Sequence, residues 1–383
     1  MVISNKKERQ NIVNTEKRKS LLQKCFLCTT IKVMKRVSFF GNVDLLFEGG
    51  IVLSSIREVA RLAKVSPATV SRVMNGTAAV APETRERVLA AIEETGFIPN
   101  EVARSLFKKS AKTIGLIIPS IRNPYFTQLA GIIDELAGQE GYRIFLCNVG
   151  GDLEKEKAAI QMLVAMNADG VILASGNQEI QSFLSGCPIP VVALDMMVST
   201  EAVEACVYCD YYQGGRLAME HLLECGCQNI VCIRGPQELF SARQRYEGYR
   251  DVCRERGIPE QTVDCDYDFL SGLAMTEKLL ECYPQVDGII ASNDIVAIST
   301  YKILHKKNIT VPDQIQLIGF DGIDLSSLMS PELTTVCQPI EDMAKKVLDV
   351  VVRQKENFEK ETEYILPVSL AIRETTKRRG REQ

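Results

Sequence analysis

The stretch VSPATVSRVMNG, residues 65–76, decides the fold of the first part of this chain. Ser66 is a good helix N-cap, and Pro67 follows at the first helical position, where its missing N–H costs nothing. Val70 and Val73 then fall on one face of the helix, and the closing Asn-Gly pair stops it. The opposite face is small, polar and cationic. The stretch therefore predicts a short helix with one apolar side and one side suited to contact another molecule.

Two further predicted helices flank this one. Ahead of it, apolar residues recur at helical spacing before a tight turn at Lys64-Val65, namely Ile56, Val59, Ala60 and Ala63. After it, a third helix is expected from roughly Pro82 to Glu94, with Gly96 just beyond its end. The side chains of this helix that are expected to point inward are Val88, Leu89 and Ile92. Two short helices across a tight turn, clamped by a third, are typical of a helix-turn-helix. Such a pair is sometimes only structural, but the outer face of the second helix suits a DNA major groove.

Four segments carry a resemblance to a known family. They are SIREVARLA (55–63), VSPATVSRVMNG (65–76), ETRERV (83–88) and PNEVARSL (99–106). Together they closely resemble the head of the lactose/galactose repressor (LacI/GalR) family of bacterial transcription regulators. The resemblance runs almost without gaps from about Ser55 to the C-terminus. It implies an all-α DNA-binding head on an effector-binding body, and hence a sequence-specific transcriptional repressor.

The resemblance assigns DNA contacts to the second helix and to a hinge helix at residues 100–107. The positions that match readers of base edges are Pro67, Ala68 and Arg72. Arg72 presents two donors, which suit a guanine. The positions that match phosphate contacts are Ser66, Thr69, Ser71 and Asn75, and such contacts set register. In the hinge helix, Asn100 is the expected cap and Leu106 the apolar wedge that opens the central base step.

From Thr113 onward the chain alternates short apolar runs with helical patterns. The first strands are expected at 114–118, 142–146, 170–173 and 190–194, with helices at 126–140 and 153–166. The alternation starts again with strands at 230–233, 288–291, 315–319 and 333–336. This order predicts an α/β body with two doubly wound parallel sheets, whose ligand binds outside the carboxyl ends of the strands. The resemblance implies the same two-lobed body, like that of the periplasmic sugar-binding proteins.

Polar and aromatic side chains near those strand ends are the expected effector contacts. Each matches a ligand-contacting position of the family: Asn123, Tyr125, Phe126, Asp195, Arg245, Tyr267, Asn293, Asp321 and Gln338. Arg245 is expected to open a helix after the Gly235-Pro236 loop, and Tyr267 to lie on the opposite side of the cleft. Aromatic faces with carboxylate, amide and guanidinium edges suit a polyhydroxylated ring. The predicted effector is a sugar or a related polar metabolite.

Several of these residues also fit other roles. Tyr125 and Phe126 fit ordinary core positions, and Arg245 with Asp321 fits a salt bridge that closes the lobes. Asp294, beside Asn293, is expected to cap its helix rather than to bind ligand.

The chain departs from the family pattern at three positions. Ala81 stands where the family usually has a serine cap, so the third helix of the head depends on Pro82. Phe107 stands beside the wedge, where related repressors often carry a basic residue. Met196 stands where sugar-binding relatives commonly place an arginine after the aspartate, and a simple pentose or hexose is the leading expectation for the effector.

Charge is distributed unevenly along the chain. The net charge is −4, but residues 55–112 carry ten Lys/Arg against six Asp/Glu, whereas residues 113–383 carry 25 against 39. A basic head on an acidic body indicates that only the head meets a polyanion. No apolar run reaches the ~18 residues of a membrane span, so we expect no membrane contact.

Thirteen cysteines and two histidines bear on metal and catalytic chemistry. Two CxxC pairs occur, Cys25/Cys28 and Cys206/Cys209, but a structural zinc site needs four clustered ligands. His221 and His305 do not complete either pair, so we expect free thiols, no metal and no cofactor. The chain has no phosphate-loop run and little acid–base material, so we expect no catalytic residues and no enzyme.

Residues 1–54 do not match the family head. They carry ten Lys/Arg and four Asp/Glu and have no sustained helical or strand period. One interpretation is a disordered basic arm that adds nonspecific DNA affinity. The other is a misassigned start, with translation beginning at Val52 or Leu53, whose codons include alternative start codons. We favour the second, because Glu48-Gly49-Gly50 can be encoded by a stretch resembling a ribosome-binding site.

These observations predict a poorly structured extension at 1–54, a helix-turn-helix head at 55–98, a hinge helix and linker at 99–112, and an effector-binding and dimerisation domain at 113–383. Its N-lobe covers about 113–209 and 339–364, and its C-lobe about 210–338 and 365–383. We expect a cytoplasmic, nucleoid-associated homodimer that binds a palindromic operator. The alternative is a sugar- or solute-binding protein that does not bind DNA, which would need a signal peptide and lack the head. The sequence does not specify the identity of the effector, whether it promotes or releases DNA binding, the operator sequence or the regulated genes. It also does not distinguish a dimer from a tetramer.

Overall fold

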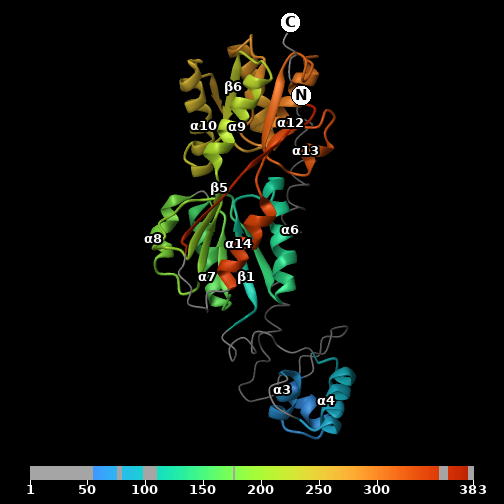
Figure 1. Cartoon of the computed structure of the whole chain (residues 1–383). Coiled ribbons are helices and arrows are strands. Elements are labelled where there is room, and N and C mark those ends of the chain that lie inside the picture. The colour runs from blue at the N-terminus through green and yellow to red at the C-terminus, as the bar shows by residue number, and fades with distance from the viewer. Residues whose placement is uncertain (1–54, 76–79, 98–109, 176, 353–360, 378–383) are drawn as a thin grey trace, which may run out of the picture. The chain divides into compact units, whose positions relative to one another are not determined.

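The computed structural model describes residues 55–75, 80–97, 110–175, 177–352 and 361–377, and the chain forms two compact units, 1–99 and 100–383 (Figure 1). Within these residues, no helix is long and apolar enough to cross a bilayer. The extension and the expected hinge helix, with Asn100 and Leu106, lie outside the described residues.

The described residues of the first unit form three helices, α2 (Ile56–Leu62), α3 (Pro67–Asn75) and α4 (Pro82–Thr95), and confirm the helix-turn-helix prediction. Each start follows from local chemistry. Ser55 caps α2 by accepting a hydrogen bond from the N–H of Glu58, and Ser66 accepts one from the N–H of Thr69. Ala81 offers no side-chain cap, so α4 begins on Pro82 alone. A glycine with φ of 59° then ends α4, where residues with a Cβ are strained.

The core of this unit is small and apolar, and it is built from Val59, Ala60, Ala63, Val70, Val73, Val88 and Ala91. The prediction that Leu89 points inward is wrong, because its side chain is 52% exposed. Leu89 follows Val88 by one residue and is therefore rotated about 100° away from it around α4. Ala91 and Ile92 continue the Val88 stripe instead.

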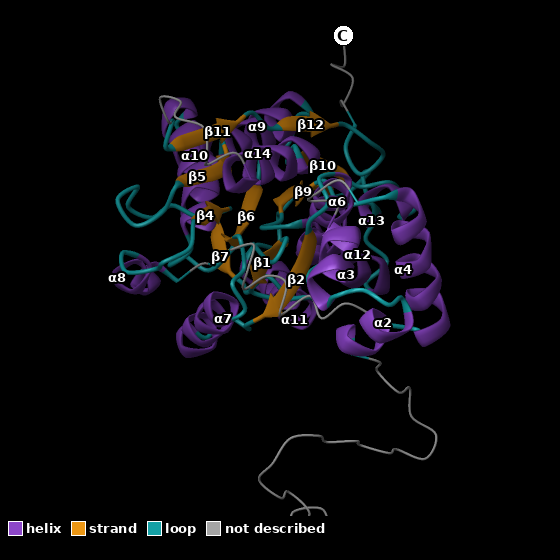
Figure 2. Cartoon of the chain, turned by 90° about the horizontal axis from the view of Figure 1, so that it is seen from below, coloured by secondary structure: helices purple, strands orange, loops and turns teal. Residues whose placement is uncertain are grey.

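The second unit is a two-lobed α/β body (Figure 1). All strands of the N-lobe sheet are parallel, in the order β11-β5-β4-β3-β1-β2. They are β1 (Thr113–Ile118), β2 (Arg143–Asn148), β3 (Gly170–Leu173), β4 (Val191–Leu194), β5 (Ala205–Cys209) and β11 (Glu363–Leu366). Helices α6 (Pro124–Gln139) and α14 (Ile340–Val352) lie side by side on one face, and α7 (Leu153–Ala165) covers β1 from the other (Figure 2). Two short helical turns, η1 (Gln178–Ile180) and α8 (Gln181–Leu184), follow β3.

The C-lobe repeats this plan with the strand order β12-β10-β9-β8-β6-β7, in which β12 alone is antiparallel. Its strands are β6 (Ile230–Arg234), β7 (Thr262–Asp264), β8 (Gly288–Ile290), β9 (Gln316–Asp321), β10 (Thr334–Cys337) and β12 (Ser369–Ala371). Its helices are α9 (Tyr211–Glu224), α10 (Phe240–Arg256), α11 (Phe269–Cys282), α12 (Asp294–Lys306) and α13 (Leu325–Leu328). Helices α9 and α10 pack together, as do α11 and α12 (Figure 1).

The prediction of two doubly wound parallel sheets is confirmed, and the continuous apolar runs are the buried strands. The chain passes between the lobes after β5, after β10 and after β11. Strand β11 pairs with β5 as far as Leu366, two residues beyond the expected limit of the N-lobe. Cys206 and Cys209 are buried in β5 as free thiols. Among the described residues, no group of three or more His, Cys, Asp or Glu could hold a metal ion.

Candidate functional site

Polar side chains follow the parallel strands of both lobes at the edge where those strands end. In the N-lobe, Asn123 follows β1 and Asp195 follows β4 directly. In the C-lobe, Asp321 is the last residue of β9, and Asn293 and Gln338 follow β8 and β10. Carboxyl ends of parallel strands are the usual place for ligand contacts in such sheets. The structure thus brings the predicted effector residues to the two facing sheet edges.

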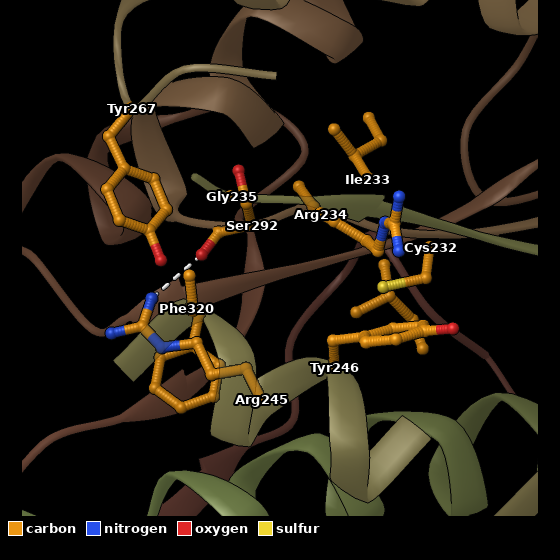
Figure 3. Close-up of a pocket in the computed structure, with 12 residues that line it drawn as sticks. Cys232, Ile233, Arg234, Gly235, Arg245, Tyr246, Tyr267, Ser292 and Phe320 are labelled. Carbon is orange, nitrogen blue, oxygen red and sulfur yellow. Dashed lines mark hydrogen bonds between the residues drawn. The ribbon is translucent and has the colours of Figure 1, made fainter. Parts of the chain in front are cut away.

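Arg245 is the centre of the C-lobe cluster (Figure 3). Its Nη1 donates to the carbonyl oxygen of Ser292 at 2.8 Å, and its Nη2 donates to Asp321 Oδ1 at 3.2 Å. The guanidinium carbon lies 3.7 Å from the centroid of the Phe320 ring. The Arg245 and Asp321 side chains are only 11% and 5% exposed. Both belong to the C-lobe, so their ion pair does not close the lobes on each other.

A cavity lies beside this cluster, lined by the ends of β6 and β8, by α10 and by Tyr267. Three buried polar atoms here have no hydrogen-bond partner among the described residues: Arg245 Nε, the Tyr267 hydroxyl and the Ser292 hydroxyl. Ser241 is near the Tyr267 hydroxyl but does not complete a bond with it. Buried polar groups are nearly always hydrogen-bonded. These three are therefore candidate contacts for a polar ligand.

A short chain of hydrogen bonds links the C-lobe cluster to the N-lobe. Gln338 Nε2 donates to Asp321 Oδ1 at 2.8 Å, and the Tyr125 hydroxyl donates to Gln338 Oε1 at 3.1 Å. Tyr125 lies in the first turn of α6 and is 2% exposed. Burial raises the pKa of Tyr125 well above its usual value, so its hydroxyl stays a donor at neutral pH. The carboxylate that pairs with Arg245 is thereby connected to the opposite lobe.

Asp195 supplies the carboxylate of the N-lobe. It accepts a hydrogen bond from the hydroxyl of Tyr211, which begins α9. Burial raises the pKa of Asp195 to about 6, and Arg245 and the Tyr211 bond act against that rise. Asp195 is therefore mostly ionised at neutral pH and able to accept hydrogen bonds from ligand hydroxyls.

The remaining predicted effector residues lie at the same edges. Asn123 Oδ1 accepts from the N–H of Tyr125 at 3.1 Å and caps α6. Asn293 Oδ1 accepts from the N–H of Val296 at 2.8 Å and caps α12. Phe126 is half-buried and meets the Tyr125 ring edge to face at 5.1 Å. In both asparagines the amide oxygen is used for capping. The amide nitrogen is the group left to donate to a ligand.

Tyr267 lies between β7 and α11, in the lobe opposite α6. Its ring comes close to Gly235, where an added Cβ would lie 2.5 Å from the ring carbons. A side chain at this point of the β6 loop would therefore displace the Tyr267 ring. The ring centroid lies 5.7 Å from the guanidinium carbon of Arg245, so Tyr267 and Arg245 share one wall of the cavity.

Two sequence predictions about helix starts are wrong. Arg245 does not open its helix, because α10 begins at Phe240 and Arg245 lies in its second turn. Leu239 precedes that start and provides no side-chain cap, so the sequence carries no capping signal there. Asp294 does not cap α12, because Asn293 does and Asp294 is the first helical residue.

Three residues of the site were missed by the sequence reasoning. Ser292 precedes Asn293, and its strand-end position was the available signal. Phe320 reads as an ordinary strand residue, yet its ring lies against Arg245. Tyr211 follows Asp210, the N-cap of α9, and was assigned no role from the sequence. Met196, the departure from the family pattern, is 3% exposed and packs in the N-lobe core.

The outer face of α3 presents the residues expected to contact DNA. Those that are exposed are Ser66, Pro67, Ala68 and Arg72. Thr69 and Ser71 are half-buried, and the hydroxyls of Ser66 and Thr69 are hydrogen-bonded at 2.9 Å. Asn75 ends α3, and its side chain lies outside what the structure describes. The base and phosphate contacts of these residues stay predictions.

Two family descriptions match this arrangement of head and body. "Bacterial regulatory proteins, lacI family" matches residues 55–100, and "Periplasmic binding proteins and sugar binding domain of LacI family" matches residues 111–373. The chain belongs to the LacI family. It is therefore a DNA-binding transcriptional regulator with a small-molecule-binding body, and the alternative of a binding protein without a DNA-binding head is set aside.

Similar proteins cover both parts of this LacI-family chain. A ribose operon repressor of Halalkalibacterium halodurans is 41% identical over 326 residues, which cover 85% of this chain and 98% of the relative. A ribose operon repressor of Bacillus subtilis is 36% identical over 332 residues, which cover 85% and 99%.

Two solved structures resemble the fold. The lac repressor dimer bound to operator and the anti-inducer ONPF has a TM-score of 0.77 and 28% identity, and the match covers 84% of this chain and 98% of that one. A LacI-type regulator from Alkaliphilus metalliredigens complexed with D-xylulofuranose has a TM-score of 0.63 and 34% identity, and covers 70% and 99%.

Proposed function

We propose that this LacI-family chain is a transcriptional repressor controlled by a monosaccharide-sized sugar at the Arg245–Asp321 cluster. The observation that carries this proposal is the set of buried, unpartnered polar atoms beside a charged pair and two aromatic rings.

The chemistry of the site suits neighbouring sugar hydroxyls. Asp321 and Asp195 accept hydrogen bonds, Arg245 Nε donates one, and the hydroxyls of Ser292 and Tyr267 do either. The ring of Tyr267 offers an apolar face for the C–H side of a sugar ring. The names of the relatives, which specify ribose in two cases and a bound D-xylulofuranose in a third, support a pentose.

Effector binding acts by shifting the balance between lobe arrangements rather than by chemistry, and the sugar is released unchanged. Because Gln338 and Tyr125 connect Asp321 to the N-lobe, a ligand at this cluster changes the relation of the two lobes. Linkage is reciprocal, so whatever the effector does to operator affinity, the operator does to effector affinity. An inducer and a corepressor fit this geometry equally, and the sign of the operator effect decides between them.

We further propose a cytoplasmic homodimer on a palindromic operator, since two heads match two half-sites. Large apolar side chains are exposed at the edge strand β2 and on α13, as expected of a surface that pairs with a second copy. They are Phe145 and Leu146 on β2, and Leu325 and Leu328 on α13.

A panel of four compounds tests the sugar assignment. D-Ribose and D-xylulose should each raise the melting temperature of the full chain and change its operator affinity, because they bind the folded state. Sucrose and a purine base should do neither. A response to sucrose or to the purine base alone would reject the monosaccharide assignment, and the direction of the operator change identifies inducer or corepressor.

Arg72 on the exposed face of α3 is expected to read one base pair per half-site. Arg72→Ala should weaken operator binding by about 1–3 kcal/mol and relax base preference at one position. Titration against operators substituted at single positions measures this and also gives the number of chains per palindrome, expected to be two or a multiple. Equal weakening on every sequence would make Arg72 a phosphate contact instead.

A further inference from the structure

Asp294 is a buried carboxylate that lies outside the Arg245–Asp321 ion pair and does not line the cavity beside it. It is 0% exposed, stands at the first position of α12 and is not the cap of that helix. One oxygen accepts from the N–H groups of Gly322 and Ile323, both at 2.9 Å. The other accepts from the hydroxyl of Thr335 on β10. A buried carboxylate with three donors aimed at it is a built arrangement, because leaving it unsatisfied would be costly.

The two N–H groups that Asp294 holds come directly after Asp321. Asp321 has a backbone φ of 117°, a region that residues with a Cβ rarely adopt and that surrounding structure must impose. Gly319, two residues earlier, makes room for the Asp294 carboxyl, since an added Cβ there would lie 2.2 Å from its oxygen. Asp294 therefore fixes the backbone directly after the carboxylate that pairs with Arg245, and Gly319 leaves room for it on the other side.

The same turn, residues 321–324, continues to the opposite lobe. The next N–H, that of Asp324, donates to Gln128 Oε1 on α6, and Gln128 Nε2 donates back to Asp324 Oδ1, both at 3.2 Å. One end of the turn thus meets Arg245 and the other end meets the N-lobe. A displacement of this turn changes both contacts together.

We propose that Asp294 is a positioning residue of the effector site, which holds turn 321–324 so that Asp321 faces Arg245 while Asp324 meets Gln128. Asp294 itself does not touch the effector. The nature of the effector rests on the proposed function, whereas the positioning role rests on the contacts of Asp294 alone.

The donor set explains why a carboxylate stands here. A carboxylate is an acceptor at both oxygens, whereas an asparagine amide would turn a donor toward either the two N–H groups or the Thr335 hydroxyl. Burial and the nearby Asp321 raise the pKa of Asp294, and the three hydrogen bonds act against that rise because they favour the ionised carboxylate. The Cys337 thiol on β10 also faces Asp294. Burial and the Asp294 carboxylate raise the pKa of this thiol, whereas Arg373 lowers it.

The test removes one hydrogen bond to Asp294 without creating a cavity in the core. Thr335→Val removes one donor to Asp294 at nearly constant shape, and Thr335→Ser restores it. Thr300→Val is the matched control, because Thr300 is equally buried in the same lobe and its hydroxyl is shared with Thr276 at 3.0 Å. Calorimetry with D-ribose on the full chain measures affinity, and thermal unfolding measures stability.

We expect Thr335→Val to weaken D-ribose binding about tenfold, as for one lost hydrogen bond to a charged group. Asp294→Asn should weaken it further. Thr335→Ser should restore native affinity, and Thr300→Val should lower the melting temperature as much as Thr335→Val while leaving affinity unchanged. Native D-ribose affinity in both Thr335→Val and Asp294→Asn would overturn the positioning role.

A wild-type chain that does not bind D-ribose would count against the proposed sugar and not against Asp294. Crystal structures of Thr335→Val and Asp294→Asn then decide the proposal without any ligand. If Asp321 leaves its unusual φ or its contact with Arg245, the positioning role stands. If Asp321 and turn 321–324 are unmoved in both variants, it is overturned.

Discussion

Arg245→Ala is expected to abolish the effector response while operator binding persists. The substitution removes the two charge-assisted hydrogen bonds to Ser292 and Asp321 and the unpartnered Nε that faces the cavity. The Nε bond to a sugar hydroxyl is charge-assisted and worth about 1.5–3 kcal/mol, so its loss corresponds to about a 10- to 100-fold loss of sugar affinity. Because α3 and its neighbours form a separate unit, the head keeps its fold. With an inducing effector the variant represses permanently, and with a corepressor it is permanently derepressed.

Stability should change with pH in a defined direction in this variant. Burial already raises the pKa of Asp321 above its ordinary value, and Arg245 acts to lower it. Without the guanidinium, the folded-state pKa rises further above the unfolded one. A carboxyl with a raised folded pKa loses stability as pH rises from its unfolded pKa through its folded pKa. Arg245→Ala should therefore be less stable, relative to wild type, at pH 7 than at pH 5.

Arg250→Ala is the control, since Arg250 lies on the same helix and pairs with Asp251 away from the cavity. Calorimetry follows sugar uptake, and operator titration with and without sugar follows the response. Asp321→Ala should behave like Arg245→Ala. Native sugar affinity in both would show that the effector binds elsewhere.

Much of the fold could be predicted because strands buried on both faces are continuous apolar runs. Strands β1, β3, β4 and β9 are of this kind. The strands that were missed lack the signal. Edge strands β11, β12 and β7 are short and partly exposed, and β5 contains Cys206 and Cys209, which were weighed as a possible metal motif.

The site was predictable to the extent that strand ends are. Asp195, Asn293 and Asp321 could be placed at the sheet edges because their strands could be recognised. The contacts between them could not, since they depend on how far each helix extends. Helix α10 starts without a capping side chain, so the position of Arg245 in its second turn had no sequence signal. Two adjacent cap-forming residues, Asn293 and Asp294, are equivalent in sequence, and only the packing shows which one caps.

The second large effect is expected from Gly215, which never touches the cavity. Gly215 lies on α9, and a Cβ added there would be 2.0 Å from the backbone oxygen of Arg245 and 2.9 Å from its carbonyl carbon. Ordinary contacts begin near 3.4 Å, so in Gly215→Ala the two helices must separate by more than an ångström. Backbone cannot rotate away as a side-chain end can. Helix α10 therefore moves and carries Arg245 with it.

We expect Gly215→Ala to lower the free energy of unfolding by about 1–3 kcal/mol, the usual range for an overpacked core. Sugar affinity should fall as well, because the guanidinium leaves its position relative to Ser292 and Asp321. Gly131→Ala on α6 is the control. Nothing lies within 4 Å of a Cβ there, so the same exchange inside a helix should stabilise the chain by about 0.5–1 kcal/mol. Chemical denaturation measures both, and the two substitutions are expected to differ in sign.

Gly248 supplies a second, internal check. Its added Cβ would lie 2.1 Å from the backbone oxygen of Tyr212. A glycine on each of the two helices therefore allows α9 and α10 to pack closely. Once either alanine has separated α9 from α10, the other meets less resistance. The double variant should therefore lose less stability than the sum of the two single losses, as contacting sites do. Strict additivity, or an unchanged sugar affinity in Gly215→Ala, would show that this helix contact does not set the position of Arg245.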